Sequence, residues 1–150
     1  MNRQIKFRGK RYPDGEWEYG DLLRIGGGCL IYYGSKTELQ TPDIPKESDV
    51  FVELLNNEVA VVVPDTVGQF TGLKDSNGKE IYEGDILKLD FGSRSCIEVV
   101  EYRDGRFVSV DPQMPYKADS LYLWLNDATV IGNIHDNSEL LKGGDYGRNG

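Results

Sequence analysis

Three observations predict that this chain is mainly β. Polar and apolar residues alternate over short stretches such as Ile5–Arg8 and Glu16–Tyr19, which is the period of a half-buried strand. Asp-Gly or Asn-Gly pairs separate such stretches at residues 14–15, 77–78 and 104–105. These pairs favour hairpin turns because both residues tolerate positive φ. Nine tyrosines, five phenylalanines and two tryptophans add side chains that suit strands.

The first turn occupies residues 12–15, between the two stretches that open the chain. Three apolar runs predict further strands in the first half: Leu30–Tyr33, Val50–Leu54 and Val59–Val63. Glycines 26–28 predict a flexible turn before the first of these runs. No Gly-Lys-Ser/Thr follows them and no G-x-G-x-x-G opens a helix, so a phosphate-binding loop is disfavoured.

The segment between the first and second runs has two prolines, at 42 and 45, and predicts a loop from Thr41 to Lys46. Asn56-Asn57 predicts the turn that would pair the second and third runs. A helix that starts from a Ser48 cap is the alternative for Val50–Leu54.

The second half repeats the pattern of short strands and turns. Asn77-Gly78 predicts a hairpin between Leu73 and Ile81. Four further strands are expected: Val99–Tyr102, Arg106–Val108, Leu121–Leu125 and Thr129–Gly132. Asp136–Leu141 predicts one helical turn, with Asn137 or Ser138 as its cap, and the glycine-rich end, Gly143–Gly150, predicts a tail.

Length and composition fit an ordinary soluble protein. The 150 residues suit one domain or two small modules, and a domain of that size buries about 70 % of its unfolded surface. No apolar run approaches the length of a membrane span, and the first residues lack a signal-peptide core. Cys29 and Cys96 have no C-x-x-C spacing. We therefore expect a cytoplasmic protein with two thiols and without a cofactor.

The net charge of −8 disfavours nonspecific binding to duplex DNA, because 25 acidic residues outnumber 17 basic ones. A basic group nevertheless opens the chain: Arg3, Lys6, Arg8, Lys10 and Arg11. It is either the solvated face of a first strand or a small docking surface for a nucleic acid or an acidic partner.

Candidate metal and catalytic groups are few. An EF-hand with Gly78 at its sixth position would begin at Leu73 and end at Gly84, where that loop needs Asp and Glu. His135 is the single histidine, and the adjacent Asp136 would point the opposite way on an extended segment. A structural or surface histidine is therefore favoured over a general base.

Two segments, Gly15–Leu23 and Gly78–Leu87, resemble each other, and each predicts a turn, a short strand, a Gly-Asp corner and a new strand. They indicate two small β modules, two corners of one barrel, or convergent turn chemistry. The carboxylates Asp21, Asp85 and Glu83 could serve a hydrolase or a metal. An Asp that follows a corner glycine could equally accept hydrogen bonds from nearby backbone N–H groups.

Three blocks resemble the YopX family of phage and prophage proteins. Their residues are 5–10 with 15–22, then 66–75 with 77–86, and finally 99–102, 105–107, 130–135 and 139–141. The resemblance implies a mainly β protein whose second half is similar to an SH3-like barrel. It carries over no catalytic residue. We therefore expect a β-rich segment over residues 1–64, and a barrel with a helical turn and tail over residues 65–150.

The leading hypothesis is a non-enzymatic accessory protein that acts by binding an unknown protein or by forming a homo-oligomer. A nucleic-acid module that uses the basic first strand and an aromatic barrel face is the second, and a hydrolase that uses the carboxylates named above is the third. The candidate binding residues are basic and aromatic: Arg3, Lys6, Arg8, Tyr32, Tyr33, Tyr102 and Phe107.

Overall fold

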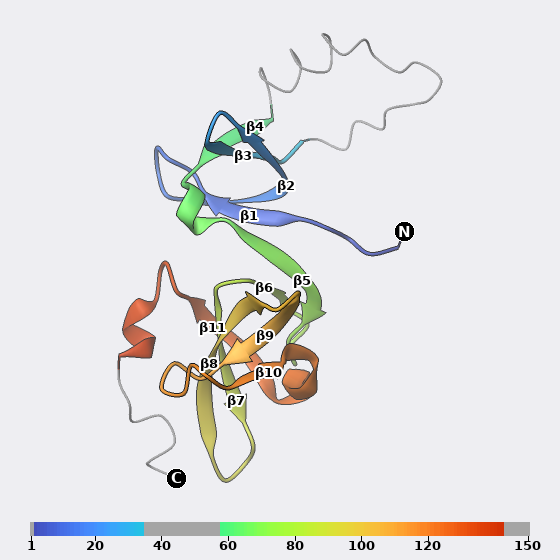
Figure 1. The fold of residues 1–150 in the computed structure, drawn as a ribbon, viewed down its shortest axis with the longest axis vertical. Helices are drawn as coiled ribbons and strands as arrows, with labels where there is room; N and C mark the ends of the chain where they lie inside the picture. Colours follow the sequence, from blue (N-terminus) through green and yellow to red (C-terminus); the bar gives the residue numbers. More distant parts are fainter. Residues whose placement is uncertain (1, 35–57, 143–150) are drawn as a thin grey trace. The chain divides into compact units, whose positions relative to one another are not determined.

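The computed structural model describes residues 2–34 and 58–142, and the chain divides into two compact units (Figure 1). One unit is Ile5–Gly68, and the other combines Met1–Gln4 with Gln69–Gly150. The sequence-based boundary lay between residues 64 and 65. Four predicted features lie outside the described residues: the loop 41–46, the strand or Ser48-capped helix at 50–54, the turn at 56–57 and the tail 143–150.

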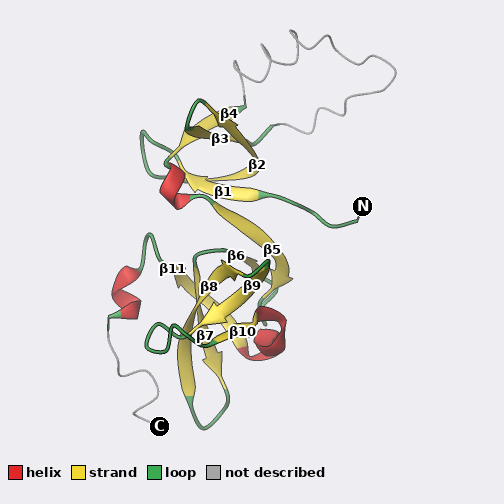
Figure 2. Ribbon diagram, in the orientation of Figure 1, coloured by secondary structure: helices red, strands yellow, loops and turns green. Residues whose placement is uncertain are grey.

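The prediction of a mainly β protein is confirmed. The described strands form two antiparallel sheets, of six and five strands, and the helical segments are short 3-10 turns (Figure 2). None of the helices in the described ranges is long and apolar enough to cross a membrane.

Four strands build the N-terminal unit: β1 (Phe7–Lys10), β2 (Trp17–Ile25), β3 (Gly28–Tyr32) and β4 (Val59–Val62). Each pairs antiparallel with the next. The predicted turn at 12–15 connects β1 to β2, and the turn predicted at 26–28 is reduced to Gly26 and Gly27, at φ 56° and 85°, because Gly28 already belongs to β3. The short helix η1 (Pro64–Thr66) follows β4.

The sheet of this unit curls so that β4 meets the chain just after β1. Arg11 forms a bridge with Val62, and the backbone N–H of Val63 donates to the Lys10 carbonyl over 2.8 Å. The inner face contains the small core of the unit, and its buried members are Cys29, Ile31 and Val62, packed against Phe7, Leu22 and Val67. Alternate residues consequently point outward.

Seven strands lie in or begin at the edge of the C-terminal unit: β5 (Gly68–Lys74), β6 (Glu80–Tyr82), β7 (Asp85–Asp90), β8 (Ser95–Arg103), β9 (Arg106–Val110), β10 (Ala118–Ser120) and β11 (Ala128–Asn133). The last five form a sheet in the order β10-β9-β8-β7-β11. The predicted turns at 77–78 and 104–105 are confirmed. Asp104 and Gly105 have φ of 51° and 77°, and Arg103 pairs with Arg106 across them.

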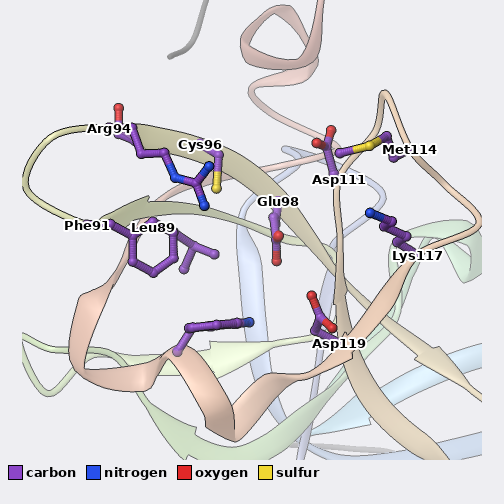
Figure 3. A pocket seen from close by; sticks show the side chains of 11 residues that line it. Leu89, Phe91, Arg94, Cys96, Glu98, Asp111, Met114, Lys117 and Asp119 are labelled. Atoms are coloured by element: carbon purple, nitrogen blue, oxygen red, sulfur yellow. The ribbon is translucent and has the colours of Figure 1, made fainter. Parts of the chain in front are cut away.

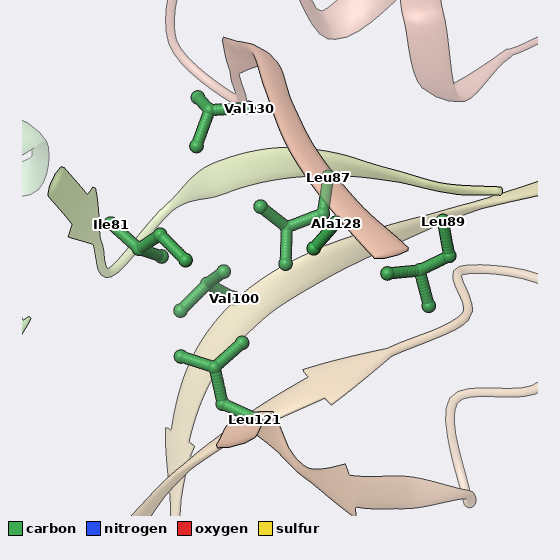
Figure 4. Packing of buried hydrophobic residues seen from close by; sticks show 7 residues of the cluster. All are labelled: Ile81, Leu87, Leu89, Val100, Leu121, Ala128 and Val130. Carbon is green, nitrogen blue, oxygen red and sulfur yellow. The ribbon is translucent and has the colours of Figure 1, made fainter. Parts of the chain in front are cut away.

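The core of this unit gathers aliphatic side chains from β6, β7, β8, β11 and the segment after β10 (Figure 4). They are Ile81, Leu87, Leu89, Val100, Leu121, Ala128 and Val130. Burial of a side chain as large as Leu or Ile contributes about 1.5–3 kcal/mol, so this cluster is a main source of the unit's stability.

Two predictions about this unit need correction. Residues 121–125 are not a strand but open the 3-10 helix η2 (Leu121–Asp127), whose curvature buries Leu121 and packs Trp124 and Leu125 against the core. The barrel is not closed, because β10 and β11 end the sheet without pairing to each other in the described part of the chain. Since η2 covers part of the apolar face, that face is buried without closure.

The predicted helical turn at 136–141 is present as the 3-10 helix η3 (Ser138–Leu141), with Asn137 at the N-cap position. The Asn137 side chain does not cap η3. Its Oδ1 accepts a hydrogen bond from the Asn133 backbone N–H over 3.2 Å, so it fixes the turn after β11 instead.

Candidate binding sites

A groove in the C-terminal unit brings together three of the predicted binding residues, Arg3, Tyr102 and Phe107. The groove has a volume of about 370 Å³. Its other lining residues come from the segment before β1, from β5 and from the β8–β9 turn: Gln4, Gln69, Phe70, Thr71, Gly72, Gly105 and Arg106. We call it the Arg–Tyr groove.

The aromatic pair of the Arg–Tyr groove is held by the tight β8–β9 hairpin. Tyr102 and Phe107 lie opposite each other in the register, and their rings meet edge to face at a centroid distance of 5.1 Å. Phe107 packs on the core, whereas Tyr102 is 54 % exposed. The Phe107 ring is therefore fixed against the core, whereas the Tyr102 ring is accessible to a ligand.

The charge of the groove is opposite to that of the chain. Two arginines line it and no Asp or Glu does, although the net charge of the chain is −8. The Arg106 Nη1 donates to Ser120 Oγ over 2.8 Å, which orients the guanidinium. Arg106 is not among the binding residues predicted from the sequence; its position directly after an Asp-Gly turn is the signal that could have identified it.

The other four predicted residues belong to the N-terminal unit. Lys6 is half-buried before β1, and Arg8 is only 6 % exposed, with its guanidinium 4.7 Å from the centroid of Trp17. Tyr32 is half-buried and its hydroxyl lies 3.4 Å from Glu58 Oε2. Tyr33 is exposed just after β3.

The basic group at the start of the chain is largely engaged locally. The Arg11 guanidinium pairs with Asp14 and, over 3.1 Å, with Glu18. The Lys10 ammonium lies 5.6 Å from the Trp17 ring centroid. Because these contacts use the basic side chains within their own hairpin, a continuous basic docking strand is not supported.

The outer face of the N-terminal sheet presents several apolar side chains beside the exposed Asp21. Strand alternation places residues on it that include Tyr19, Leu23, Ile25, Leu30 and Val61. Val61 is 52 % exposed and Ile25 50 %, so this face is accessible in the described residues. Exposed apolar faces of this kind often contact other proteins.

A second cavity of the C-terminal unit, of about 390 Å³, has a different chemistry (Figure 3). Strand register explains its polar floor. Cys96 and Glu98 lie opposite Leu89 and Leu87, so they occupy the same face of the sheet as the aliphatic core. Asp119, on β10, lies opposite Ser109 of β9. We call it the Glu98 cavity, and its lining residues are Leu89, Phe91, Arg94, Ser95, Cys96, Glu98, Asp111, Met114, Lys117, Asp119 and Trp124.

Glu98 is 9 % exposed. Its Oε2 and the Ser109 Oγ have no hydrogen-bond partner that meets normal geometric limits in the described part of the chain. Burial raises the pKa of the Glu98 carboxyl above its usual 4.5, and the Asp119 and Asp111 charges raise it further, while the nearby Ser109 hydroxyl opposes the shift. A carboxylate in such a position destabilises the fold.

The thiol beside Glu98 is not activated. Burial raises the pKa of the Cys96 thiol, and the charges of Glu98 and Asp111 raise it further, against the opposing effect of Arg94. Since the thiolate is the nucleophilic form, these surroundings do not favour nucleophilic chemistry at Cys96.

The raised pKa of Glu98 makes stability depend on pH. Between the unfolded and folded pKa values the native state binds the extra proton, so the free energy of unfolding falls as pH rises through that interval. We expect the stability of Glu98→Gln relative to wild type to increase as pH rises above the usual carboxyl pKa of 4.5. Urea unfolding of both proteins over this range of pH measures the difference.

Glu139→Gln is the control for this comparison, because it changes the net charge equally at an exposed residue of η3. The side chains that face Glu98 in the cavity, namely Cys96, Asp111, Asp119, Arg94 and Lys117, are present in every protein compared. The expectation would be contradicted if the free energies of unfolding of Glu98→Gln and Glu139→Gln changed with pH in the same way.

Two of the three candidate carboxylates, Asp85 and Glu83, accept hydrogen bonds from backbone N–H groups. Asp85 is buried, and its Oδ2 accepts the Tyr82 backbone N–H over 2.7 Å. Glu83 Oε1 accepts the Gln69 backbone N–H over 3.3 Å. Asp21, by contrast, is an exposed residue within β2.

His135 lies exposed in the turn after β11, where its backbone N–H donates to Asn133 Oδ1 over 3.0 Å. No group of three or more His, Cys, Asp or Glu residues in residues 2–34 and 58–142 could hold a metal ion.

Asp75, which the sequence placed in the rejected EF-hand loop and in the second YopX-like block, has a structural role in the β5–β6 turn. It is 7 % exposed. Its Oδ1 accepts the N–H groups of Asn77 and Lys79 over 2.8 and 2.9 Å, and its Oδ2 accepts that of Val130 over 2.9 Å. Burial alone would raise the pKa of Asp75, but these bonds hold it below its usual 3.8.

Comparison with known proteins gives a family, and the solved structures that match the chain include the two described below. The family model described as YopX protein matches residues 6–142. Protein EF1440 from Enterococcus faecalis is 25 % identical, with 93 % of this chain and 99 % of that chain covered and a TM-score of 0.49. Protein yopX from Bacillus subtilis is 22 % identical, with 95 % and 98 % covered and a TM-score of 0.48. No curated protein matches the chain.

Proposed function

The chain belongs to the YopX family, and we propose that it is a non-enzymatic phage or prophage accessory protein that binds an acidic segment of another protein in the Arg–Tyr groove. The phage setting rests on the family resemblance, as does a place in the host cytoplasm. The SH3-like description of the C-terminal unit, as an open barrel, is part of the same proposal.

One observation carries this proposal: a groove with two arginines, three aromatic rings and no acidic side chain, in a chain of net charge −8. Arginine pairs with carboxylates through two parallel hydrogen bonds, and Tyr and Arg are frequent at the energetic centres of protein interfaces. The groove thus suits a carboxylate beside an apolar or aromatic side chain.

A protein partner is favoured over a nucleic acid on grounds of charge. A nucleic acid brings a continuous row of phosphates, and its binding strengthens with the number of Lys and Arg residues that contact them. The groove has two arginines, and the acidic remainder of the chain would repel the flanking phosphates. A short acidic peptide segment meets the arginines without that repulsion.

The non-enzymatic part of the proposal is supported by how the candidate carboxylates are used. Asp85 accepts the Tyr82 backbone N–H at its own corner, and Glu83 accepts the Gln69 backbone N–H on β5. A general base or metal ligand needs its lone pairs directed at a substrate or an ion. In these two carboxylates, one oxygen already accepts a backbone hydrogen bond.

Binding to a short fluorescein-labelled peptide of glutamate and tyrosine tests the proposal. We expect wild-type protein to bind this peptide in a fluorescence anisotropy titration, and to bind a lysine–tyrosine peptide of the same length and oligothymidylate much more weakly. Arg106→Glu should weaken binding about tenfold, the equivalent of about 1.4 kcal/mol for reversal of one interfacial charge.

Arg24→Glu is the matched control, because Arg24 is an exposed residue of β2 in the N-terminal unit and the charge change is identical. Melting curves of both variants verify that the loss of the Arg106–Ser120 hydrogen bond has not unfolded the protein. Light scattering in the same buffers measures the molar mass of the protein. It is included because self-association through the outer face of the N-terminal sheet is the alternative to binding of another protein. Equal binding by the two variants, or preferential binding of oligothymidylate, would refute the proposal.

A further inference from the structure

The Glu98 cavity contains a buried carboxylate whose Oε2 has no hydrogen-bond partner in the described part of the chain. Figure 3 shows Glu98 in the middle of the lining side chains, with Phe91 on one side and Lys117 and Asp119 on the other. The carboxylate is on the core face of β8, next to Leu87 in the register. A carboxylate there weakens the fold, and an aliphatic side chain would strengthen it, so its presence needs a chemical reason.

The surroundings are acidic on balance. Glu98, Asp111 and Asp119 line the cavity against Arg94 and Lys117. None of these five forms an ion pair within the described part of the chain. The Arg94 guanidinium lies 5.8 Å from the Phe91 ring centroid, which places it beside the aromatic wall. Arg94 and Lys117 thus line the cavity without forming an ion pair with Glu98.

The rest of the lining is apolar and well formed. Phe91 and Trp124 meet edge to face at a centroid distance of 5.3 Å, and Leu89 and Met114 complete the wall. A volume of about 390 Å³ falls in the range of small-molecule sites. Aromatic faces also attract cations, so the walls suit an alkyl chain that ends in a positive charge.

A metal ion fits this site less well than an organic cation. The carboxylates of Glu98, Asp111 and Asp119 do not form one of the clusters that could hold a metal ion, and a hard cation would leave the aromatic wall unused. An ammonium group donates up to three hydrogen bonds, and its alkyl chain would pack on the rings.

We propose that the Glu98 cavity binds a primary alkylammonium group, with Glu98 as its counter-ion and the Phe91–Trp124 pair packed against its alkyl chain. The ammonium can come from a free diamine or from a lysine side chain of another protein. The cavity and the Arg–Tyr groove share no lining residue, so this inference does not depend on the proposed function.

Isothermal titration calorimetry with the full chain tests the inference. The probes are butane-1,4-diamine, N-acetyl-lysine methylamide and, as a neutral isostere, N-acetyl-norleucine methylamide. We expect saturable binding of at least one amine and none of the norleucine derivative. Tighter binding of the diamine points to a free amine as the ligand, and tighter binding of the lysine derivative points to a protein side chain.

Two substitutions locate the binding. Glu98→Gln retains the shape of the side chain and should weaken amine binding at least about tenfold, because the ammonium would lose its buried charged partner. Asp119→Asn should weaken it about threefold, and since Asp119 is exposed this variant remains informative if the first does not fold. Glu139→Gln, on the surface of η3, should bind as wild type.

Three results would overturn the inference. The first is the absence of saturable heat from either amine up to about 10 mM, a concentration at which even weak sites fill. The second is equal binding of the norleucine derivative. The third is unchanged amine affinity in both Glu98→Gln and Asp119→Asn. Unchanged amine binding in Arg106→Glu is expected, and it separates this site from the Arg–Tyr groove.

Discussion

Asp75→Ala is expected to lower the free energy of unfolding by about 3–5 kcal/mol, the cost of removing one partner from a buried, charged hydrogen-bond network. Three backbone N–H groups would lose their acceptor at once. Asn77 and Lys79 belong to the β5–β6 turn, whereas Val130 belongs to β11, 55 residues further along the chain. The carboxylate therefore closes a turn and also fastens that turn to the sheet.

The Val130 N–H is the most costly donor to leave without a partner. Val130 is a buried residue of the core cluster, and the β7–β11 register shifts between Val130 and Gly132. At an irregular position of a β-ladder, a backbone N–H can lack the carbonyl acceptor that the neighbouring strand would normally provide. A side chain must then accept the hydrogen bond. Asp75 supplies that acceptor.

Urea unfolding at neutral pH measures this loss. Asp90→Ala is the control, because Asp90 also accepts a turn N–H, from Gly92 over 2.9 Å, but is exposed. We expect Asp90→Ala to lower the free energy of unfolding much less than Asp75→Ala does. Since the folded pKa of Asp75 is depressed, its contribution is present at neutral pH and is lost as pH falls through that pKa. Equal losses in the two variants would disprove this role for Asp75.

Gly20→Ala is expected to destabilise the N-terminal unit by at least about 2 kcal/mol, as overpacking against backbone does. A Cβ at Gly20 would overlap the Tyr32 carbonyl oxygen and lie 2.8 Å from the Tyr32 carbonyl carbon and 3.1 Å from the Tyr33 Cα. The neighbouring atoms are backbone, so no side chain can rotate away. The end of β3 would have to move, and it adjoins the small core that holds the curled sheet.

Gly28→Ala is the matched control in the same hairpin, because its Cβ would meet only the Ile25 carbonyl oxygen at 3.4 Å. Thermal unfolding followed by near-ultraviolet circular dichroism reports on the unit through Trp17. We expect a clear loss for Gly20→Ala and a small change for Gly28→Ala. A Gly20→Ala protein as stable as the control would show that β2 and β3 do not approach as described.

The sequence predicts strands and turns well where turn chemistry is local. Asp104-Gly105 and the glycines at 26–27 take positive φ, which is a property of the two residues themselves. The segment 121–125 was assigned wrongly because an apolar run fits either a strand or a buried helical turn. The contact that decides between them is with Leu87 and other distant residues, which no local pattern contains.

The similarity between the two Gly-Asp segments is not repeated in the structure. Gly84 has φ of 89° and leads to the buried Asp85, which closes its corner. Gly20 lies within β2, with the exposed Asp21 after it. Similar residues thus serve a turn in one place and a close approach of two strands in the other, because the surrounding chain decides which conformation is adopted.

The candidate sites were predictable in part. Arg3, Tyr102 and Phe107 were selected by residue type, and the structure places them in one groove. Arg8 was selected for its charge, and it is buried against Trp17. Glu98 was missed because a carboxylate in an apolar strand is usually assigned to the outer face. Its register opposite Leu87 depends on pairing that the sequence of β8 alone does not determine.

Mapping of backbone amide shifts by nuclear magnetic resonance tests the central claim, that an acidic protein segment binds in the Arg–Tyr groove. Titration of labelled protein with a short Glu/Tyr peptide should shift the amides of Thr71, Gly72, Tyr102, Arg106 and Phe107, the residues that line the groove. The shifts should saturate together. Shifts that concentrate on the outer face of the N-terminal sheet, or no shifts at all, would contradict the claim.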